Sequence, residues 1–142
     1  MQQKLKVCKV HREAVLPTRA YEHDAGYDLY SNEDIELKPG QHHGIATGIS
    51  MAVPKGHVGL IWDKSGIAIK HGLKTKAGVI DAGYRGEVVV GMINLSDKVF
   101  KIEKGMKVAQ ILIQEVKVPE IEEVDSLDET ERADQGFGSS GK

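Results

Sequence analysis

The chain has 142 residues, of which 40% are hydrophobic and 28% charged, and this balance is typical of one soluble globular domain. The 19 basic and 21 acidic residues give a formal net charge of −2, so no overall positive field is available to hold a nucleic acid backbone. The N-terminus lacks an apolar signal-peptide core, and no apolar run is long enough to cross a bilayer. We therefore expect a cytoplasmic protein that has neither a nucleic acid nor a membrane as partner.

Short β-prone segments follow one another along the chain, separated by turns that contain Gly or Pro. In chain order they cover residues 5–10, 24–31, 35–37, 45–53, 58–62, 78–80, 88–95, 100–102 and 106–118. One or two helical turns are expected within Asp63–Gly72, with Gly72 as the stop. This array of short strands predicts an all-β sandwich, barrel or jelly roll.

Cys8 is the only cysteine in the chain, which excludes an internal disulfide and any zinc site built from several cysteines. It lies in the alternating segment near the N-terminus. A buried position on a strand is therefore expected for Cys8, and not a reactive thiol.

The stretch Gly78–Glu87 combines an apolar pair, an acid, a glycine-containing turn and an aromatic residue. Two β-prone segments around such a turn predict a β-hairpin. Its bend carries Asp81 and Tyr84, three residues apart. By itself the stretch fits a plain surface hairpin, because Asp and Gly are ordinary turn residues. The other motifs favour a functional loop.

The composition changes at Pro119. Residues 120–132 are strongly acidic, and their apolar residues are spaced three apart, which is compatible with a short helical turn. The end of the chain places Phe137 between two glycines and ahead of two serines. Taken alone, this tail fits either a frayed terminus or a loop whose amides wrap phosphate oxygens and whose ring stacks on a base.

Five stretches together resemble the five motifs of the trimeric dUTPases, which cleave dUTP to dUMP and pyrophosphate. In the family's order they are Ala25–Ser31, Lys64–Ala68, Gly78–Glu87, Gly105–Ile111 and Arg132–Gly141. The resemblance covers nearly the whole chain. It implies a dUTPase-type β jelly roll (β-clip), with a core in residues 1–118 and a flexible C-terminal arm in residues 119–142. It also implies a homotrimer with active sites at subunit interfaces.

The same resemblance implies a reaction in which water attacks the α-phosphorus of dUTP. This reaction removes dUTP and supplies dUMP for thymidylate synthesis. Asp81 matches the carboxylate that orients and activates the water, and Gln110 matches a glutamine near the α-phosphate. The implied cofactor is Mg²⁺ bridging the phosphates, and Asp28 matches a carboxylate near the metal-bound waters or the arm arginine.

The implied substrate-binding residues divide between the base, the sugar and the phosphates. Tyr84 packs against the deoxyribose and leaves no room for a 2′-hydroxyl, and Phe137 stacks on uracil. The edge of uracil is read by the backbone of Gly78, Val79, Ile80 and the region of Val89. The phosphates are contacted by Lys64, Ser65, Gly66, Arg132, Gly138, Ser139 and Ser140.

Two motifs depart from the family pattern. The usual Pro-Arg-Ser-Gly of the second motif is replaced by Asp63–Gly66, and Lys64 offers a point charge without the bidentate fork of arginine. In the fifth motif, residues 133–135 (Ala-Asp-Gln) replace a run of small, mostly Gly residues. This change predicts a stiffer arm and brings Asp134 toward the triphosphate.

Two alternatives stay open on the sequence. A dCTP deaminase or bifunctional deaminase–dUTPase shares the fold but usually has a longer chain and needs a glutamate base; Glu87 lies at the far end of the predicted hairpin without a matching motif. A non-catalytic jelly-roll binding module would tolerate the loss of Asp81, Gln110 or Phe137, and all three residues are present.

Overall fold

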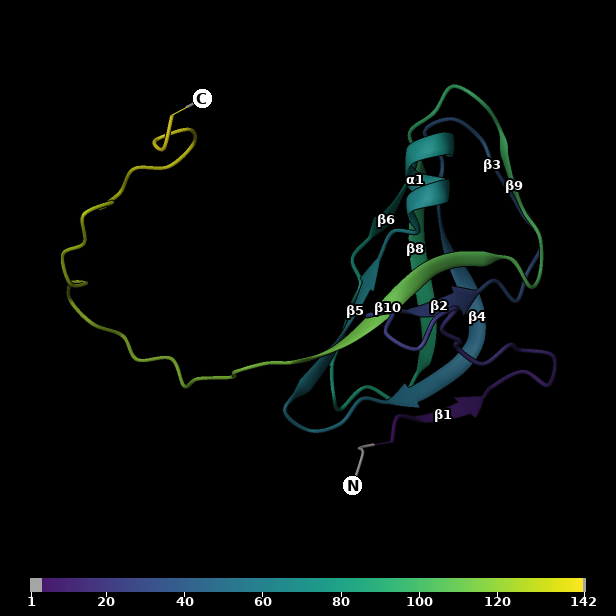
Figure 1. Ribbon diagram of the computed structural model, residues 1–142, viewed down its shortest axis with the longest axis horizontal. Coiled ribbons are helices and arrows are strands. Elements are labelled where there is room, and N and C mark those ends of the chain that lie inside the picture. The colour runs from purple at the N-terminus through teal and green to yellow at the C-terminus, as the bar shows by residue number, and fades with distance from the viewer. Residues whose placement is uncertain (1–3, 142) are drawn as a thin grey trace.

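The structure, a computed structural model, describes residues 4–141 and contains two four-stranded sheets, one two-stranded sheet and one short helix (Figure 1). All strand pairs are antiparallel. Within residues 4–141 no helix has the length and apolarity needed to cross a bilayer. The elements are β1 (Lys6–Lys9), β2 (Tyr27–Tyr30), β3 (Ile35–Leu37), β4 (His42–Ala52), β5 (His57–Trp62), α1 (Ser65–His71), β6 (Leu73–Lys76), β7 (Val79–Ile80), β8 (Glu87–Asn94), β9 (Phe100–Ile102) and β10 (Lys107–Glu115).

The core lies between the two larger sheets. The first sheet has the strand order β1-β4-β8-β6, the second has the order β2-β10-β5-β7, and β3 pairs with β9. Side chains alternate across each strand, so that every second residue of β8 is buried. Both sheets contribute apolar side chains to one buried cluster, which includes Leu29, Ile45, Ile49, Ile61, Val88, Val90, Met92 and Ile111. The all-β class predicted from the sequence is therefore confirmed.

A bulge in β10 sets which side chains face outward near one end of the second sheet. Lys107 pairs with Tyr30, whereas Ala109 already pairs with the next residue of β2, so that Val108 is the extra residue. Val108 and Ala109 are both buried. As a result Lys107 and Gln110, which are three residues apart, lie on the same outer face. Bulges commonly redirect side chains in this way beside functional sites.

The prediction of a β-hairpin across Gly78–Glu87 is wrong. β7 pairs with β5 in the second sheet, whereas β8 pairs with β4 and β6 in the first. The turn between them therefore carries the chain from one sheet to the other. The prediction also missed β6, although its residues Leu73 and Thr75 are buried and alternate with two exposed lysines, which is the period-two pattern of a strand.

Two local predictions have different outcomes. α1 spans seven residues and ends at Gly72, which adopts the left-handed conformation at φ 69, as the sequence predicted. The buried position predicted for Cys8 is wrong, because this residue is exposed. β1 is an edge strand of the first sheet, and it is Val7, next to Cys8, that packs against the core.

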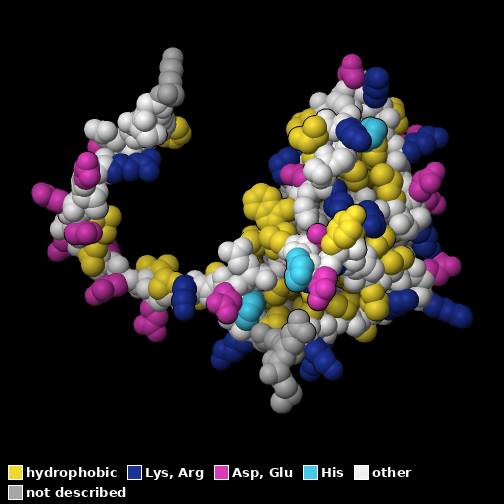
Figure 2. Space-filling view, viewed as in Figure 1, with side chains coloured by type: hydrophobic (Ala, Val, Ile, Leu, Met, Phe, Trp, Pro, Cys, Tyr) yellow, Lys and Arg dark blue, Asp and Glu magenta, His cyan; other side chains and the backbone are white. Residues whose placement is uncertain are grey.

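The chain beyond β10 leaves the body and arcs away from it (Figures 1 and 2). Residues 116–141 are exposed and contain turns and bends but no strand or helix. The short helical turn considered for residues 120–132 is therefore not present in the described part of the arm. An isolated turn without a packing partner is not stable in water. The division of the chain into a core and an arm at Pro119 stays a prediction.

Asn94 offers a test of the contacts that close the end of the core. It is fully buried, and its amide donates to the carbonyl oxygens of Leu37 at 2.8 Å and Lys98 at 2.7 Å, while its side-chain oxygen accepts from the N–H of Ser96 at 2.9 Å. Asn94→Ala should lower the free energy of unfolding by about 3 kcal/mol or more, since each buried polar group left unpaired costs about 1–3 kcal/mol. Urea unfolding at fixed protein concentration measures the loss. The exposed neighbour variant Asp97→Ala is the control, and equal stability of the two variants would contradict the role of Asn94.

Candidate active site

A buried carboxylate holds two lysines together at the outer face of the second sheet. In β2, Oδ1 of Asp28 accepts a hydrogen bond from Nζ of Lys64 at 2.6 Å, and its Oδ2 lies 3.1 Å from Nζ of Lys107. The Asp28 side chain is only 6% exposed, whereas those of Lys64 and Lys107 are 33% and 45% exposed. The three groups carry a net charge of +1, and their positive ends reach solvent.

The pKa shifts in this cluster favour the charged forms. Burial raises the pKa of Asp28, but the hydrogen bonds and charges of Lys64 and Lys107 together lower it by more than burial raises it, so that the net shift is downward. The hydrogen bond and the charge of Asp28 in turn raise the pKa of Lys107. Both shifts favour the charged forms of Asp28 and Lys107. Lys107 was missed by the sequence interpretation, although a lysine within the fourth motif was a visible signal.

Asp63, which precedes Lys64, joins the loop before α1 to two strands. Its Oδ2 accepts from Nζ of Lys74 at 2.7 Å and its Oδ1 from the N–H of Thr75 at 2.7 Å, both in β6. Its carbonyl oxygen accepts from Nε2 of Gln110 in β10 at 2.9 Å. The carboxylate therefore faces β6 and fixes the loop.

The first and fourth motifs meet at Gln110. This residue lies directly opposite Asp28 in the ladder between β10 and β2. Its side chain also lies against the backbone of Gly26, where a Cβ atom would come within 2.5 Å of Oε1 of Gln110. Only glycine permits this close approach without a shift of the Gln110 side chain. Gln110 is thereby held from both sides, by Gly26 and by Asp63.

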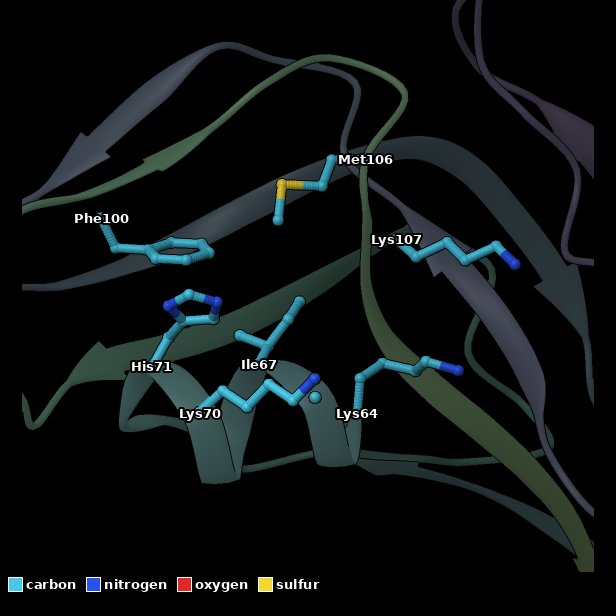
Figure 3. Close-up of a pocket in the computed structure, with 8 residues that line it drawn as sticks. Lys64, Ile67, Lys70, His71, Phe100, Met106 and Lys107 are labelled. Atoms are coloured by element: carbon cyan, nitrogen blue, oxygen red, sulfur yellow. The ribbon is translucent and has the colours of Figure 1, made fainter.

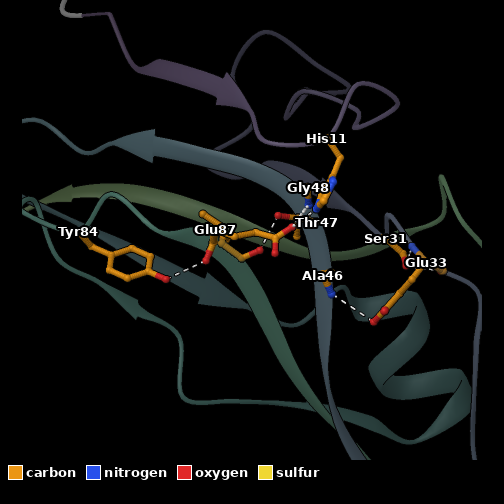
Figure 4. Close-up of polar contacts among 9 residues, drawn as sticks. His11, Ser31, Glu33, Ala46, Thr47, Gly48, Tyr84 and Glu87 are labelled. Carbon is orange, nitrogen blue, oxygen red and sulfur yellow. Dashed lines mark hydrogen bonds and ion pairs between the residues drawn. The ribbon is translucent and has the colours of Figure 1, made fainter.

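The loop that carries Asp81 is closed by its own backbone. The N–H of Tyr84 donates to the carbonyl oxygen of Asp81 at 3.0 Å, and the Tyr84 hydroxyl donates to the carbonyl oxygen of Glu87 at 2.9 Å (Figure 4). Nη1 of Arg85 donates to the carbonyl oxygens of Ala82 at 2.7 Å and Tyr84 at 2.8 Å. Within residues 4–141 no donor is bonded to the Asp81 carboxylate, which is exposed. The loop is thus fixed while its acid is free to accept from a ligand.

The entry to this loop is set by Gly78. Its φ of 112 lies in the region that favours glycine, and a Cβ atom here would lie 2.9 Å from the carbonyl oxygen of Ile61. The carbonyl oxygen of Gly78 accepts from the N–H of Ile61 at 2.8 Å. β7 therefore begins tightly against β5. Because β7 is the last strand of its sheet, its other edge is not paired with any strand of residues 4–141.

The sites built on β10 and β7 do not meet within one chain. Gln110 lies opposite Trp62 of β5, whereas Ile80 lies opposite Gly59 of the same strand, and β10 and β7 flank β5 on opposite sides. Three residues along β5 span about 10 Å, and two strand spacings add about 9.6 Å across the sheet. The backbone positions of Gln110 and Ile80 are therefore about 14 Å apart.

The arm residues are also separate from the body. Arg132 makes a local contact, in which its Nε donates to the carbonyl oxygen of Gln135 at 2.9 Å, and Phe137 is exposed. Ala133 has a φ of 47, in the left-handed region that costs free energy for residues with a Cβ atom. One chain thus brings together Asp28, Lys64 and Gln110, and keeps both Asp81 and the arm away from them.

The described residues do not fit a Mg²⁺ site made by the protein alone. No group of three or more His, Cys, Asp or Glu residues that could hold a metal ion occurs in the described part of the chain. Each oxygen of Asp28 already has an ammonium partner, and these two positive charges oppose a divalent cation beside it. A metal at this site has to bring most of its oxygen ligands with it, as Mg²⁺ does when it binds through substrate phosphates and water.

Comparisons with known proteins agree with these motifs. The family model described as dUTPase matches residues 12–141. The deoxyuridine 5'-triphosphate nucleotidohydrolase of Mycolicibacterium vanbaalenii is 48% identical, over 96% of this chain and 94% of the relative, and that of Clostridium novyi is 46% identical, over 97% and 99%. The dUTPase of Staphylococcus bacteriophage 80alpha, solved with dUPNHPP, superposes with a TM-score of 0.93 at 31% identity and covers 99% of this chain and 100% of the phage chain.

A second solved structure concerns a metal. An aspartate-to-asparagine variant of the dUTPase from phage phi11 of S. aureus, in which a structural Mg(II) ion is coordinated, has a TM-score of 0.82 at 29% identity and covers 87% of this chain and 98% of the phage chain. Together these similarities confirm the predicted dUTPase-type jelly roll.

The contacts of Asp63 predict a pH dependence of stability. Burial raises the pKa of Asp63, but the hydrogen bonds from Lys74 and Thr75 together lower it by more than burial raises it. The folded-state pKa therefore lies below the ordinary value of 3.8. A lowered pKa contributes stability that is fully present above the unfolded-state pKa and is lost as the pH falls through the folded-state pKa. In Asp63→Asn the free energy of unfolding should therefore be lower at neutral pH and should fall less steeply below about pH 4.

Urea unfolding of the Asp63→Asn variant and of the unchanged protein, repeated from neutral to acidic pH, measures the two slopes. Asp97→Asn, at an exposed turn, is the matched control. The same acid slope in Asp63→Asn and in the unchanged protein would remove Asp63 from this role.

Proposed function

Because the chain belongs to the dUTPase family and is a dUTP hydrolase, we propose that it produces dUMP and pyrophosphate by attack of water on the α-phosphorus. The observation that carries this proposal is the exposed Asp81 carboxylate, which lies on a closed turn and has no hydrogen-bond donor within residues 4–141. The chain that presents it matches the family over residues 12–141. The reaction removes dUTP and supplies dUMP for thymidylate synthesis. The cytoplasm stays the compartment that we propose.

The proposed active site is shared between copies in a homotrimer. The separation of about 14 Å between β7 and Gln110 supports this assembly, because β5 lies between the strands that carry the Asp81 loop and Gln110 in one chain. One copy supplies Asp81 and Tyr84, a second supplies Lys64 and Gln110, and the arm of a further copy covers the substrate. Exposed apolar residues beside these loops, including Trp62, Val79 and Val89, are available to be covered by the partner copies.

The outer edge of β7 is suited to recognition of the base. Edge-strand N–H and C=O groups at Gly78, Val79 and Ile80 have no strand partner on that side and can pair with the alternating acceptors and donor of uracil. Cytosine presents a different pattern and leaves buried groups unpaired, at a cost of about 1–3 kcal/mol each. Val89 is exposed on β8 near the same turn. Tyr84, held through its hydroxyl by Glu87, packs against the deoxyribose and excludes a 2′-hydroxyl.

The proposed phosphate contacts come from the start of α1 and from the arm. Lys64 supplies a cation, Ser65 a hydroxyl, and Gly66 an open backbone, because nothing lies within 4 Å of the position of a Cβ atom there. From the arm, Arg132 reaches the phosphates and Phe137 stacks on uracil. The remaining arm contacts are made by the backbone and hydroxyls of Gly138, Ser139 and Ser140.

In the proposed reaction Asp81 acts mainly by position. An ordinary aspartate is a weak base, with a pKa of about 3.9 in peptides. It can nevertheless accept a hydrogen bond from a water and aim it in line with the leaving pyrophosphate. Gln110 orients the α-phosphate, and the lysine cations stabilise the negative charge that develops on the phosphate oxygens. Mg²⁺ is proposed as part of the substrate, Mg–dUTP.

The deaminase alternative is not favoured by the contacts of Glu87. Its Oε1 accepts from the N–H of Gly48 at 2.8 Å and lies 3.7 Å from Nε2 of His11 (Figure 4). This carboxylate joins β8 to β4 and does not point to the loop that carries Asp81. Release of ammonia from dCTP by the protein would support the deaminase alternative.

Asp81→Asn tests the proposed reaction directly. The variant should lose about 10²–10⁴-fold in turnover of dUTP, since this is the usual contribution of a positioned acid–base group. Its affinity for dUMP should be unchanged, because the amide keeps the size of the side chain. Pyrophosphate release with Mg²⁺ from dUTP, dCTP, dTTP and UTP, measured in parallel, gives both the rate and the specificity.

The exposed variant Asp97→Asn is the control for Asp81→Asn. Retained turnover in Asp81→Asn would remove Asp81 from the mechanism. Release from none of the four nucleotides by the unchanged protein would favour a binding module without catalysis.

Phe137→Ala tests the arm. Stacking of a base on an aromatic ring contributes about 1–3 kcal/mol, so kcat/KM for dUTP should fall about 5- to 150-fold while the core stays folded. The matched control is Leu127→Ala, which shortens another exposed apolar side chain of the same arm. Equal loss in both variants, or no loss in Phe137→Ala, would contradict a specific stacking role.

A further inference from the structure

The two lysines that share Asp28 have donors left over. An ammonium group carries three N–H donors, and both Lys64 and Lys107 direct one of them to the carboxylate of Asp28. Neither ammonium group has a further partner within residues 4–141, so two donors on each lysine are available to a ligand there. The carboxylate itself is almost completely buried, so water does not compete with the lysines for its oxygens. Both ammonium groups are therefore held in place before any ligand arrives.

The pair lies beside a cavity of about 420 Å³ whose other lining side chains are mainly apolar, among them Ile67, Phe100 and Met106. Lys64 precedes α1 and Lys107 begins β10, and both extend in the same direction, away from Phe100 (Figure 3). Lys70 of α1 lines the same cavity. The protein as a whole has a net charge of −2, so a triphosphate depends on local cations such as these.

The second motif has lysine in place of the usual arginine, and the pair of lysines can compensate for this substitution. A guanidinium contacts phosphate oxygens through two parallel N–H groups, which a single ammonium cannot do. Two ammonium groups, each fixed on one oxygen of the same carboxylate, together offer two N–H donors to neighbouring phosphate oxygens, as a single guanidinium does. The pairing requires a buried acid between them, and Asp28 is that acid.

We propose that Asp28 is a positioning residue that holds Lys64 and Lys107 as a paired clamp for the β- and γ-phosphates of dUTP. The inference rests on the proposed function and adds Lys107 to the substrate-binding residues. It is an alternative to the expected role of Asp28 near metal-bound waters, because each oxygen of this carboxylate already has a lysine partner. In this proposal Lys107 contacts the pyrophosphate portion of the substrate, which leaves in the reaction, and not its dUMP portion.

Lys107→Met tests the clamp, because it keeps the length of the side chain and removes the charge. Its affinity for α,β-imido-dUTP, a non-hydrolysable triphosphate, should fall about 10-fold or more, since a hydrogen bond to a charged group contributes that much. Its affinity for dUMP should change less than about twofold. Lys107→Arg should restore triphosphate binding. The control is Lys101→Met, which removes an exposed lysine of β9 that pairs with Glu36.

Asp28→Asn separates the clamp from a metal role. With Mg²⁺ titrated at fixed α,β-imido-dUTP, the variant should bind the triphosphate more weakly but reach half of its maximal binding at the same Mg²⁺ concentration as the unchanged protein. If Asp28 instead held metal-bound water, the half-saturating Mg²⁺ concentration would rise in Asp28→Asn and stay constant in Lys107→Met. Thermal unfolding identifies any loss of fold, and the Lys107 variants keep the test decisive in that case.

The outcomes distinguish the clamp from the proposed function. Hydrolysis of dUTP by the unchanged protein, combined with equal triphosphate affinity in Lys107→Met and Lys101→Met, would overturn the clamp alone. A parallel loss of dUMP and triphosphate affinity in Lys107→Met would also overturn it, because the effect would then be structural. Absence of both dUMP and triphosphate binding in the unchanged protein would overturn the proposed function and the clamp together.

Discussion

Asp63 connects the two sheets at the point where the loop that we propose to bind the phosphates leaves β5. Its carboxylate is held by Lys74 and Thr75 of β6, in the first sheet, and its carbonyl oxygen is held by Gln110 of β10, in the second. The loop between β5 and α1 therefore cannot move without breaking contacts to both sheets. Asp63 stands where the family usually has a proline. A proline ring would restrict the backbone of the loop directly, whereas here the hydrogen bonds of Asp63 hold that backbone in place. The position of Lys64 follows from this anchor.

A sandwich of two sheets places its functional loops on different edges. β7 closes one edge of the second sheet, and β2 with Asp28 closes the other, so that a strand register, and not a flexible linker, keeps Asp81 away from Gln110. Such a chain carries two half-sites and a free arm. The proposed association of identical copies would complete the site and would cover exposed apolar residues beside the polar loops, such as Val79.

Local features of this fold could be predicted from the sequence, and long-range ones could not. The strand alternation and the stop of α1 at Gly72 depend on neighbours in the chain. The sheet to which β7 and β8 belong depends on pairings with distant strands, and for that reason the hairpin prediction failed. The resemblance supplied the motif residues, but the pairing of Asp28 with Lys64, 36 positions away, and with Lys107 depends on the bulge in β10 and the register of β2. No pattern in the sequence records that register.

The length of the free arm has a consequence for how its ring is delivered. A tethered segment meets its target at an effective concentration of about millimolar. A single ring stack of about 1–3 kcal/mol does not saturate a site at that concentration, so closure would also need the ionic contacts with the phosphates that we propose for Arg132. We expect an arm balanced in this way to close over a triphosphate and to open over a monophosphate, so that the loss of pyrophosphate itself would be the signal that releases dUMP.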